Sequence, residues 1–304
     1  MISNIQADIL KLKKEMGVTI LAHSYQSQDI TEIADFVGDS YQLSLKAKSD
    51  KNQTFIMCGV HFMAETVKIL SPNKKVILAH PQAGCPMAEQ IQPNFIVDFK
   101  KKNPDYAVVA YINTTAALKT VCDVCVTSAT AVKICEKIEN KNILFIPDCN
   151  LGAYVAEKLP QKNIKLVQGG CPVHASVTAD EVIEAKNLHP NALVLCHPEC
   201  TPAVLKQADF IGSTSAIMDF AEKSDKKDFI IGTEISIAEH LGFSCPEKNF
   251  HIMSKKLICQ NMRICTLIDV YNALRGTGGL EILMDSETIS KAYGCIDRMI
   301  ELGK

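Results

Sequence analysis

The sequence predicts an α/β protein built from three αβα sandwich domains, each with a parallel four-stranded sheet, related by pseudo-threefold symmetry around a central site. Three observations support this prediction. An eighteen-residue pattern occurs three times, apolar runs of strand length alternate with helical segments, and one cysteine recurs at the spacing of the pattern. Strands that alternate with helices are typical of parallel sheets, and a fixed period indicates repeated supersecondary units.

The repeated pattern aligns without a gap. Its copies, HSYQSQDITEIADFVGDS (residues 23–40), YINTTAALKTVCDVCVTS (111–128) and HPECTPAVLKQADFIGST (197–214), begin 88 and 86 residues apart. The alignment brings Asp35, Asp123 and Asp209 into register. We therefore predict three domains, formed by residues 1–86 with 260–304, by residues 87–172 and by residues 173–259.

Four apolar runs in each repeat predict the four strands. They are VTILA, ADFVGDS, FIMCGV and KVILAHP in the first repeat, YAVVA, CDVCVTS, ILFIPD and IKLVQGG in the second, and ALVLC, ADFIGST, FIIGTE and NFHIMS in the third. Such runs are expected where both faces of a strand are covered. Ligands gather beyond the carboxyl ends of parallel strands, where the first strands lead into His23, Tyr111 and His197. Because His23 and His197 share one position, we interpret them as functional.

Helices are predicted between the strands and at both ends of the chain. Ile5, Ile9 and Leu12 have helical spacing, and SETISKAYGCIDRMIEL predicts a C-terminal helix that packs on the first repeat. The segment Arg275–Gly279 is similar to a phosphate-binding loop but lacks the Gly-Lys-Ser/Thr sequence of such loops. We interpret it as a flexible connection.

Composition excludes several classes of protein. The 304 residues are 47% hydrophobic and 22% charged with a net charge of -2, which is typical of a globular protein and does not favour nucleic-acid binding. No apolar run approaches the ~18 residues of a membrane span, and the N-terminus lacks the pattern of an export signal. Thirteen cysteines are an odd number and too few for a disulfide scaffold. These features predict a reducing, cytoplasmic location without membrane contact.

Three of the cysteines follow the repeat. Cys85, Cys171 and Cys259 are 86 and 88 residues apart, and each lies just beyond the fourth strand of its repeat. Three thiolates suit either zinc with a fourth ligand or a [4Fe–4S] cluster with one iron that lacks a cysteine. The spacing alone does not decide, although such widely separated ligands are unlike structural zinc and favour the cluster.

Most other cysteines are predicted to pack in the core. Cys122, Cys125 and Cys196 align with small or apolar residues in the other repeats, so the Cys122–Cys125 pair is weak evidence for a zinc or redox site. Cys200 and Cys265 lie near the predicted site, and a redox role for them stays open.

Many short segments resemble the quinolinate synthase family over nearly the whole chain. They are HSYQ, IADFVGDS, CGVHFMAET, HPQAGCPMAE, YINTTAALK, PDCNLGAYVA, GGCPVH, HPEC, IGSTSAIM, GTE and the segment CQNMRICTL. The resemblance implies three αβα sandwiches with pseudo-threefold symmetry. It also implies condensation of iminoaspartate with dihydroxyacetone phosphate to quinolinate, phosphate and water in NAD biosynthesis, with a [4Fe–4S] cluster as cofactor.

The resemblance also implies which residues carry the chemistry. The cluster ligands fall on Cys85, Cys171 and Cys259. The active-site tyrosine of the HSYQ segment falls on Tyr25. The substrate contacts fall on His23, Ser40, Tyr111, Ile112, Asn113, Ser128, His197, Pro198, Glu199 and Thr214.

The chain departs from the family pattern at a few loops. It has no tryptophan before the second cluster cysteine, Thr266-Leu267-Ile268-Asp269 replaces a Thr-Leu-Glu sequence, and Ser27-Gln28-Asp29 replaces a Pro-Glu pair. The stretch after the GTE segment also lacks an expected glycine. No ligand or catalytic candidate is lost, so the departures concern the local shape of loops.

The chemistry of the implied reaction assigns roles to these residues. The substrates bring two carboxylates and one phosphate, and we expect one anion at each strand-to-helix turn, at Ser40, Ser128 and Thr214. The alternative is that these residues are simply helix N-caps. Dehydration needs a Lewis acid, which an open iron supplies, and groups that move protons. The proton-transfer candidates are Glu199, His197, Tyr111, His23 and Tyr25, of which Glu199 is the first choice.

Other functions remain open at this point. Three cysteines also suit another hydro-lyase with an open-iron cluster, a zinc enzyme, or a non-catalytic iron–sulfur sensor. As partners we expect the small-molecule substrates and a transient contact with an enzyme that produces iminoaspartate.

Overall fold

The computed structural model describes residues 2–304, and the chain divides into two compact units. Unit 1 comprises the chain up to Cys85, Thr115–Ala117 and Cys259–Tyr293. Unit 2 comprises Pro86–Thr114, Leu118–Ile258 and Gly294–Lys304.

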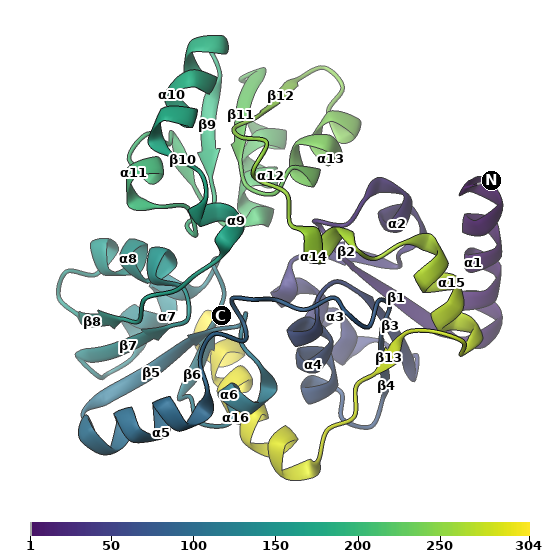
Figure 1. Cartoon of the computed structure of the whole chain (residues 1–304), viewed down its shortest axis with the longest axis horizontal. Helices are drawn as coiled ribbons and strands as arrows, with labels where there is room; N and C mark the ends of the chain where they lie inside the picture. Colours follow the sequence, from purple (N-terminus) through teal and green to yellow (C-terminus); the bar gives the residue numbers. More distant parts are fainter. Residues whose placement is uncertain (1) are drawn as a thin grey trace. The chain divides into compact units, whose positions relative to one another are not determined.

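Unit 1 contains one five-stranded sheet (Figure 1). Its parallel strands are β1 (Val18–His23), β2 (Phe36–Gly38), β3 (Thr54–Cys58) and β4 (Lys75–Leu78). A fifth strand, β13 (Leu280–Glu281), pairs antiparallel with β4 at the edge.

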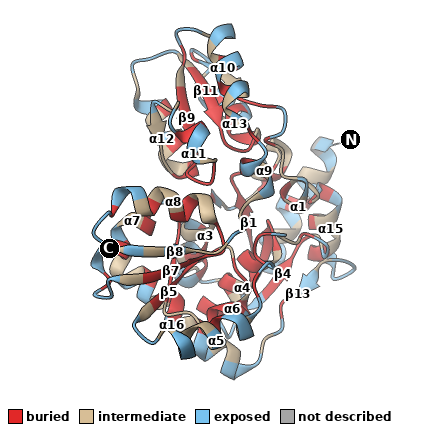
Figure 2. Cartoon of the chain, turned by 60° about the vertical axis from the view of Figure 1, so that its left-hand side comes forward, coloured by how far each residue is buried: buried red, intermediate tan, exposed pale blue. Residues whose placement is uncertain are grey.

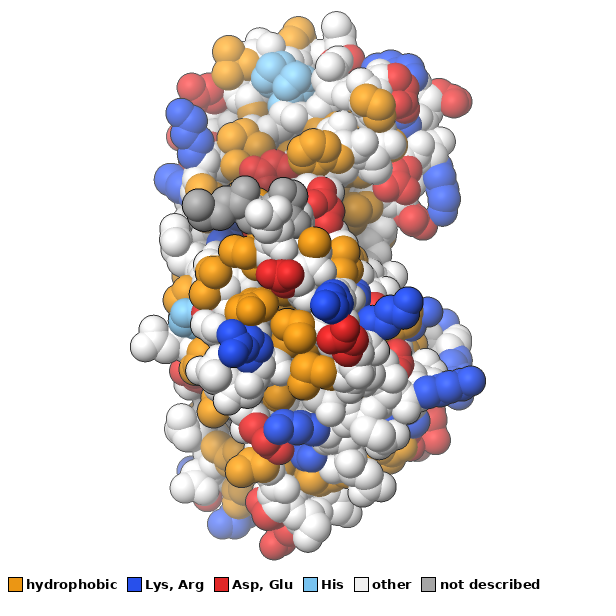
Figure 3. Space-filling model, turned by 90° about the vertical axis from the view of Figure 1, so that its right-hand side faces the viewer, with side chains coloured by type: hydrophobic (Ala, Val, Ile, Leu, Met, Phe, Trp, Pro, Cys, Tyr) orange, Lys and Arg blue, Asp and Glu red, His pale blue; other side chains and the backbone are white. Residues whose placement is uncertain are grey.

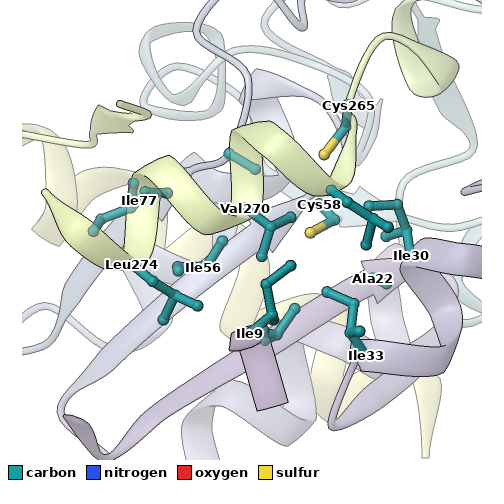
Figure 4. Close-up of a cluster of buried hydrophobic side chains, with 14 of the residues drawn as sticks. Ile9, Ala22, Ile30, Ile33, Ile56, Cys58, Ile77, Cys265, Val270 and Leu274 are labelled. Carbon is teal, nitrogen blue, oxygen red and sulfur yellow. The ribbon is translucent and has the colours of Figure 1, made fainter. Parts of the chain in front are cut away.

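Helices cover both faces of this sheet. Alternate strand residues point to opposite faces. On one face, Ile56 of β3 packs in a buried cluster with Ile9 of α1 (Ile2–Met16) and Val270 of α15 (Leu267–Arg275), as Figure 4 shows. The helix α2 (Gln28–Ile33) contributes to the same cluster, whereas α3 (Ser40–Ser49) and α4 (His61–Leu70) pack together on the opposite face. The predicted N-terminal helix is confirmed.

Unit 2 contains two four-stranded parallel sheets. One is built from β5 (Tyr106–Tyr111), β6 (Val124–Val126), β7 (Asn142–Ile146) and β8 (Asn163–Leu166), and the other from β9 (Leu193–Cys196), β10 (Phe210–Ile211), β11 (Asp228–Gly232) and β12 (Asn249–Ile252). Figure 2 shows their central strands in the red of buried residues. The helices between β4 and β12 are α5 (Pro93–Lys102), α6 (Ala116–Lys119), α7 (Ala131–Lys137), α8 (Cys149–Lys158), α9 (Pro172–Ala175), α10 (Ala179–Leu188), α11 (Pro202–Leu205), α12 (Thr214–Lys223) and α13 (Ser236–Ser244).

The predicted α/β class with three parallel sheets is confirmed. Within each repeat the strands lie in the same order across the sheet: fourth, third, first, second. The alignment of the aspartates is also reflected in their contacts. Each carboxylate accepts a hydrogen bond from a first-strand N–H, and the pairs are Asp35 with Ile20 (2.8 Å), Asp123 with Val108 (2.7 Å) and Asp209 with Val194 (2.8 Å).

Three lysines at the repeat spacing also make equivalent contacts, which sequence analysis did not predict. Each ammonium group donates to backbone carbonyls at the C-terminal end of a helix, which satisfies carbonyls that have no partner within the helix. The carbonyls belong to Ala47 and Asp50 for Lys74, to Ile138 and Asn140 for Lys162, and to Ala221, Glu222 and Ser224 for Lys248.

The glycine-rich segment is not simply a flexible connection. Gly276 ends α15 with a φ of 70°, and the N–H of Thr277 donates to the carbonyl of Asn272 (3.0 Å), so the segment closes a helix end. The strand β13 then follows directly. Sequence analysis missed β13 because a two-residue strand carries no periodicity and forms only against an existing edge.

The C-terminal helix α16 (Ser286–Gly303) is confirmed, but its predicted packing is only partly right. In unit 1, Lys48 donates to the hydroxyl of Tyr293 (3.1 Å). In unit 2, the thiol of Cys295 lies 3.1 Å from that of Cys125 in β6, and Lys137 donates to the carbonyl of Leu302 (2.7 Å). The second half of the helix therefore packs on the second repeat.

Two surface properties bear on partners. Among the helices of residues 2–304, none is both long and apolar enough to cross a membrane. On the face drawn in Figure 3, the blue Lys and Arg side chains are interspersed with red Asp and Glu. The absence of a nucleic-acid partner stays a prediction that rests on the net charge of -2.

Candidate functional site

Three predicted residues of unit 2 come together at strand ends. Tyr111 is the last residue of β5, and His197 and Glu199 follow β9. All three side chains are buried. The carboxylate of Glu199 accepts a hydrogen bond from Tyr111 and lies 3.6 Å from Nδ1 of His197. The carboxyl ends of two different sheets thus contribute to one polar cluster.

His174 completes this cluster and was missed by sequence analysis. Its Nδ1 lies 2.8 Å from a carboxylate oxygen of Glu199 and 3.3 Å from the sulfur of Cys171, and its Nε2 lies 3.1 Å from the hydroxyl of Thr233. Its ring centroid is 4.9 Å from that of His197. The signal was present in the segment GGCPVH, where a histidine stands three residues after the cysteine, one turn along the short helix α9.

The charges of the cluster stabilise one another. Burial raises the pKa of Glu199, but the neighbouring His197 and His174 and the hydrogen bond from Tyr111 lower it more, so the pKa lies below its usual value. Burial lowers the pKa of His174, but the Glu199 carboxylate raises it by more, so the pKa lies above its usual value, at about 9. The pairing therefore favours the ionised form of Glu199 and the protonated form of His174.

The backbone before Cys171 requires glycine. Gly169 and Gly170 have φ values of 148° and 153°, a region that side chains rarely adopt. The Gln90 amide clamps this turn, because it accepts from the Gly170 N–H and donates to the Gly170 carbonyl, both at 3.1 Å. The carboxylate of Asp148 accepts from the N–H groups of Cys171 (2.9 Å) and Leu151 (2.8 Å). The thiol of Cys171 is thus held at a fixed place at the start of α9.

The Cys171 neighbourhood is a candidate metal site. The ligand atoms of Cys171, His174 and Glu199 lie within 4.8 Å of one another. Burial, followed by the charge of Glu199, raises the pKa of the Cys171 thiol well above its usual value and that of Asp148 to about 7. A metal bound here would have to displace the thiol proton.

Two predicted anion contacts of unit 2 lie near helix starts. Thr214 is the first residue of α12, whose N-cap is Ser213, and Ser128 lies just before α7, whose N-cap is Thr130. The alternative that Thr214 and Ser128 are themselves N-caps is therefore wrong. A cavity of about 540 Å³ is lined by Ser128, by Pro198 and by Ser213. Its size suits a small molecule.

The predicted residues of unit 1 lie around the end of β1. His23 is the last residue of that strand, and its Nδ1 accepts from the N–H of Tyr25 (3.1 Å). The two rings meet edge to face at 4.5 Å. Ser40 is the first residue of α3, and its neighbour Asp39 caps the helix by accepting from the N–H groups of Tyr41 and Gln42. The N-cap alternative is wrong for Ser40 as well.

The other two predicted metal ligands also lie in unit 1. Cys85 follows β4 in a loop, and Cys259 is the N-cap of the short helix α14 (Gln260–Arg263), as Cys171 is of α9. All three thiols are half-buried. Each of them offers the soft thiolate donor that iron–sulfur clusters use, and their joint binding of one cluster stays a prediction.

The cysteines assigned to the core have different surroundings. Cys125 and Cys196 are buried, and all thirteen cysteines are present as thiols. Burial, with Cys125 and Asp123 nearby, raises the pKa of Cys122. Cys122 packs against the hydrophobic core of the second repeat, and its thiol donates to the carbonyl of Leu118 (3.2 Å), which agrees with the core interpretation.

Comparisons with known proteins identify the family. The family model described as Quinolinate synthetase A protein matches residues 7–301. The curated quinolinate synthase of Caldicellulosiruptor bescii is 45% identical over 299 residues, which are 98% of each chain. Those of Clostridium kluyveri and Clostridioides difficile are each 44% identical, over 295 and 296 residues, with 97% of each chain covered. The chain therefore belongs to the quinolinate synthetase A family.

Proposed function

We propose that this protein is a quinolinate synthase that condenses iminoaspartate with dihydroxyacetone phosphate to quinolinate, phosphate and water. We also propose that Cys85, Cys171 and Cys259 hold a [4Fe–4S] cluster. The family membership and the buried group of Glu199, His174 and Tyr111, beside the half-buried Cys171, support this function. The observation that carries it is the buried Glu199 carboxylate, which lies between His174 and the hydroxyl of Tyr111 and within 4.8 Å of Cys171, a cysteine at the repeat spacing.

These side chains suit the proton transfers that the reaction requires. The carboxylate of Glu199 accepts a proton from a substrate carbon or hydroxyl, and the imidazolium of His174 returns one. The hydroxyl of Tyr111 and the ring of His197 hold the carboxylate in place. Burial excludes water from these transfers. When bound, the cluster would supply a Lewis-acidic iron for a leaving hydroxyl.

The substrate anions would bind at the strand-to-helix turns. We propose one anion at each of Ser40, Ser128 and Thr214. Ser40 and Thr214 each begin a helix of ten residues. The N-cap of each helix is the preceding residue, Asp39 or Ser213. N–H groups and the positive end of the helix dipole favour an anion there. His23 and Tyr25 would complete the site from the first repeat, with Ile112, Asn113 and Pro198 from the other two.

The repeat organisation belongs to the same proposal. We assign the three domains to residues 1–86 with 260–304, 87–172 and 173–259, arranged with pseudo-threefold symmetry around one site. A transient contact with an enzyme that produces iminoaspartate would shorten the path of this reactive substrate. The cytoplasmic location stays a prediction, which rests on the odd number and low density of the thirteen cysteines.

The test is anaerobic reconstitution with iron and sulfide, followed by an assay with iminoaspartate and dihydroxyacetone phosphate. We expect a brown protein that contains about four irons per chain and forms quinolinate. A brown protein without turnover would support a sensor instead, or another hydro-lyase.

A mononuclear metal enzyme is the second candidate. The close approach of Cys171, His174 and Glu199 favours it, since one sulfur, one nitrogen and one oxygen ligand suit zinc. Metal analysis separates the two candidates. One zinc per chain in a colourless protein, retained when Cys85 is replaced by alanine, would favour the mononuclear site.

A further inference from the structure

We propose that Lys119 is a positioning residue of the candidate active site, which fixes the turn that carries Tyr111 and Asn113. This inference rests on the proposed function. Lys119 is the last residue of α6, and its side chain is completely buried. Lysine is almost never fully buried unless its charge is compensated, because removing an ammonium group from water is costly.

The contacts of Lys119 show where it acts. Its ammonium group donates to the carbonyl of Ile112 at 2.9 Å and to the carbonyl of Thr114. These two carbonyls flank Asn113, which the resemblance assigns to substrate binding. Two hydrogen bonds therefore hold the turn directly after β5 against the lysine.

Because the peptide bond is planar, the contact between Lys119 and the carbonyl of Ile112 also fixes the direction of the Asn113 N–H. In a trans peptide the C=O and the following N–H point in opposite directions. Because the carbonyl of Ile112 points at Lys119, the N–H of Asn113 points away from it, where it can donate to a substrate anion. Asn113 is half-buried, whereas Ile112 and Thr114 are buried. The carbonyls of Ile112 and Thr114 thus point toward the buried Lys119, and Asn113 lies on the opposite side of the turn.

The same turn holds Tyr111. The hydroxyl of Thr114 donates to the carbonyl of Tyr111 (3.2 Å), and the N–H of Thr114 donates to the carbonyl of Ile112 (2.8 Å). The Tyr111 side chain in turn donates to Glu199. A contiguous set of contacts therefore leads from the Lys119 ammonium through the turn to the proposed proton acceptor.

The other repeats do not use a lysine at this position. The aligned residues are Thr31 and Leu205. By contrast, Lys248 has equivalents in all three repeats and closes the end of α12. Lys119 and Lys248 are the only buried lysines among residues 2–304. Lys248 thus has a structural role that all three repeats share, whereas Lys119 is specific to the repeat that supplies Tyr111 and Asn113.

The variant for the test is Lys119→Met, which keeps the length of the side chain and removes its charge and donors. The matched control is Lys248→Met, which removes a buried ammonium group from carbonyls at a helix end. Both variants should lose some stability. Only Lys119→Met should lower kcat/KM, on the order of tenfold or more, with unchanged iron content, because the reacting groups are misplaced.

A double-mutant cycle with Tyr111→Phe separates positioning from a general loss of stability. If Lys119 acts through Tyr111, adding Lys119→Met to Tyr111→Phe should lower kcat/KM by less than about twofold further. Multiplicative effects in the cycle, or a Lys119→Met rate within about twofold of wild type, would overturn the proposal.

Amide hydrogen exchange provides a readout that needs no turnover. The amides of Ile112 and Thr114 donate to the carbonyls of Val126 and Ile112 (both 2.8 Å). In Lys119→Met their exchange should be on the order of tenfold faster, and in Lys248→Met it should be unchanged. Equal exchange rates in wild type and Lys119→Met would refute the inference. If wild-type protein forms no quinolinate, the proposed function fails, and the exchange rates still decide whether Lys119 holds the turn.

Discussion

The carboxylate of Glu199 lies 2.8 Å from Nδ1 of His174, and both side chains are buried. His174 belongs to the helix that starts at Cys171, whereas Glu199 follows β9. The pair therefore connects the cysteine loop to a strand end. The pair also favours the ionised form of Glu199, which is the form that can accept a proton.

The cluster ligands are tested by single replacements. Cys171→Ala should lose most of the bound iron and all activity, because two cysteines hold a cluster poorly. Cys122→Ala is the control, since this residue packs against the core of the second repeat and its thiol donates to the carbonyl of Leu118. Iron is measured per chain after anaerobic reconstitution. Full iron content in the Cys171→Ala protein would show that the ligand assignment is wrong.

The glycine turn before Cys171 is tested by Gly170→Ala. A Cβ atom at this position would stand 2.9 Å from a carboxylate oxygen of Asp148, in a backbone conformation that disfavours alanine. We expect weaker iron retention and a loss of about 1–3 kcal/mol of stability. The control is Gly294→Ala in α16, where a Cβ meets nothing within 4 Å. This change should stabilise the helix by up to about 1 kcal/mol.

A pH-dependent contribution to stability is expected from Glu181. Burial raises its pKa, but the N–H of Thr178, the hydroxyl of Ser254 and the ammonium of Lys256 lower it to about 2. The folded state therefore favours the ionised form. Its contribution is fully present above the ordinary pKa of 4.5 and is lost as the pH falls toward about 2.

The measurement is the urea midpoint of Glu181→Gln against wild type across this pH range. At pH 7 the variant should be less stable by about 1 kcal/mol, the usual scale for a lost capping box. The difference should shrink below pH 4.5. Glu184→Gln, an exposed position on the same helix, should show no such trend. A difference independent of pH would contradict the assignment.

The repeat explains why so much of the fold was predictable. A buried parallel strand is a continuous apolar run, and three aligned copies confirm each other, so all twelve repeat strands were found. The aligned Asp35, Asp123 and Asp209 make the same backbone contact. The strand β13 and the packing of the second half of α16 on the second repeat escaped prediction because both depend on tertiary partners outside the repeat.

The candidate site was predictable only in part. Tyr111, His197 and Glu199 stand at strand ends, where position alone indicates function. His174 and Asp148 act on Glu199 and Cys171 through contacts between segments distant in sequence. Lys119 resembles an ordinary helix lysine in the sequence, and only its burial distinguishes it. Such roles depend on packing, which no local pattern records.

The most direct test of the account is the rate of quinolinate formation by the iron-loaded wild type and by Glu199→Gln. Glutamine keeps the size of the side chain and removes the proton acceptor. We predict that wild type forms quinolinate and that the variant is on the order of 10²-fold slower or more, with unchanged iron content. The control Glu157→Gln, at an exposed position of α8, should keep the wild-type rate. No quinolinate from the wild type, or near-normal turnover by Glu199→Gln, would contradict the account.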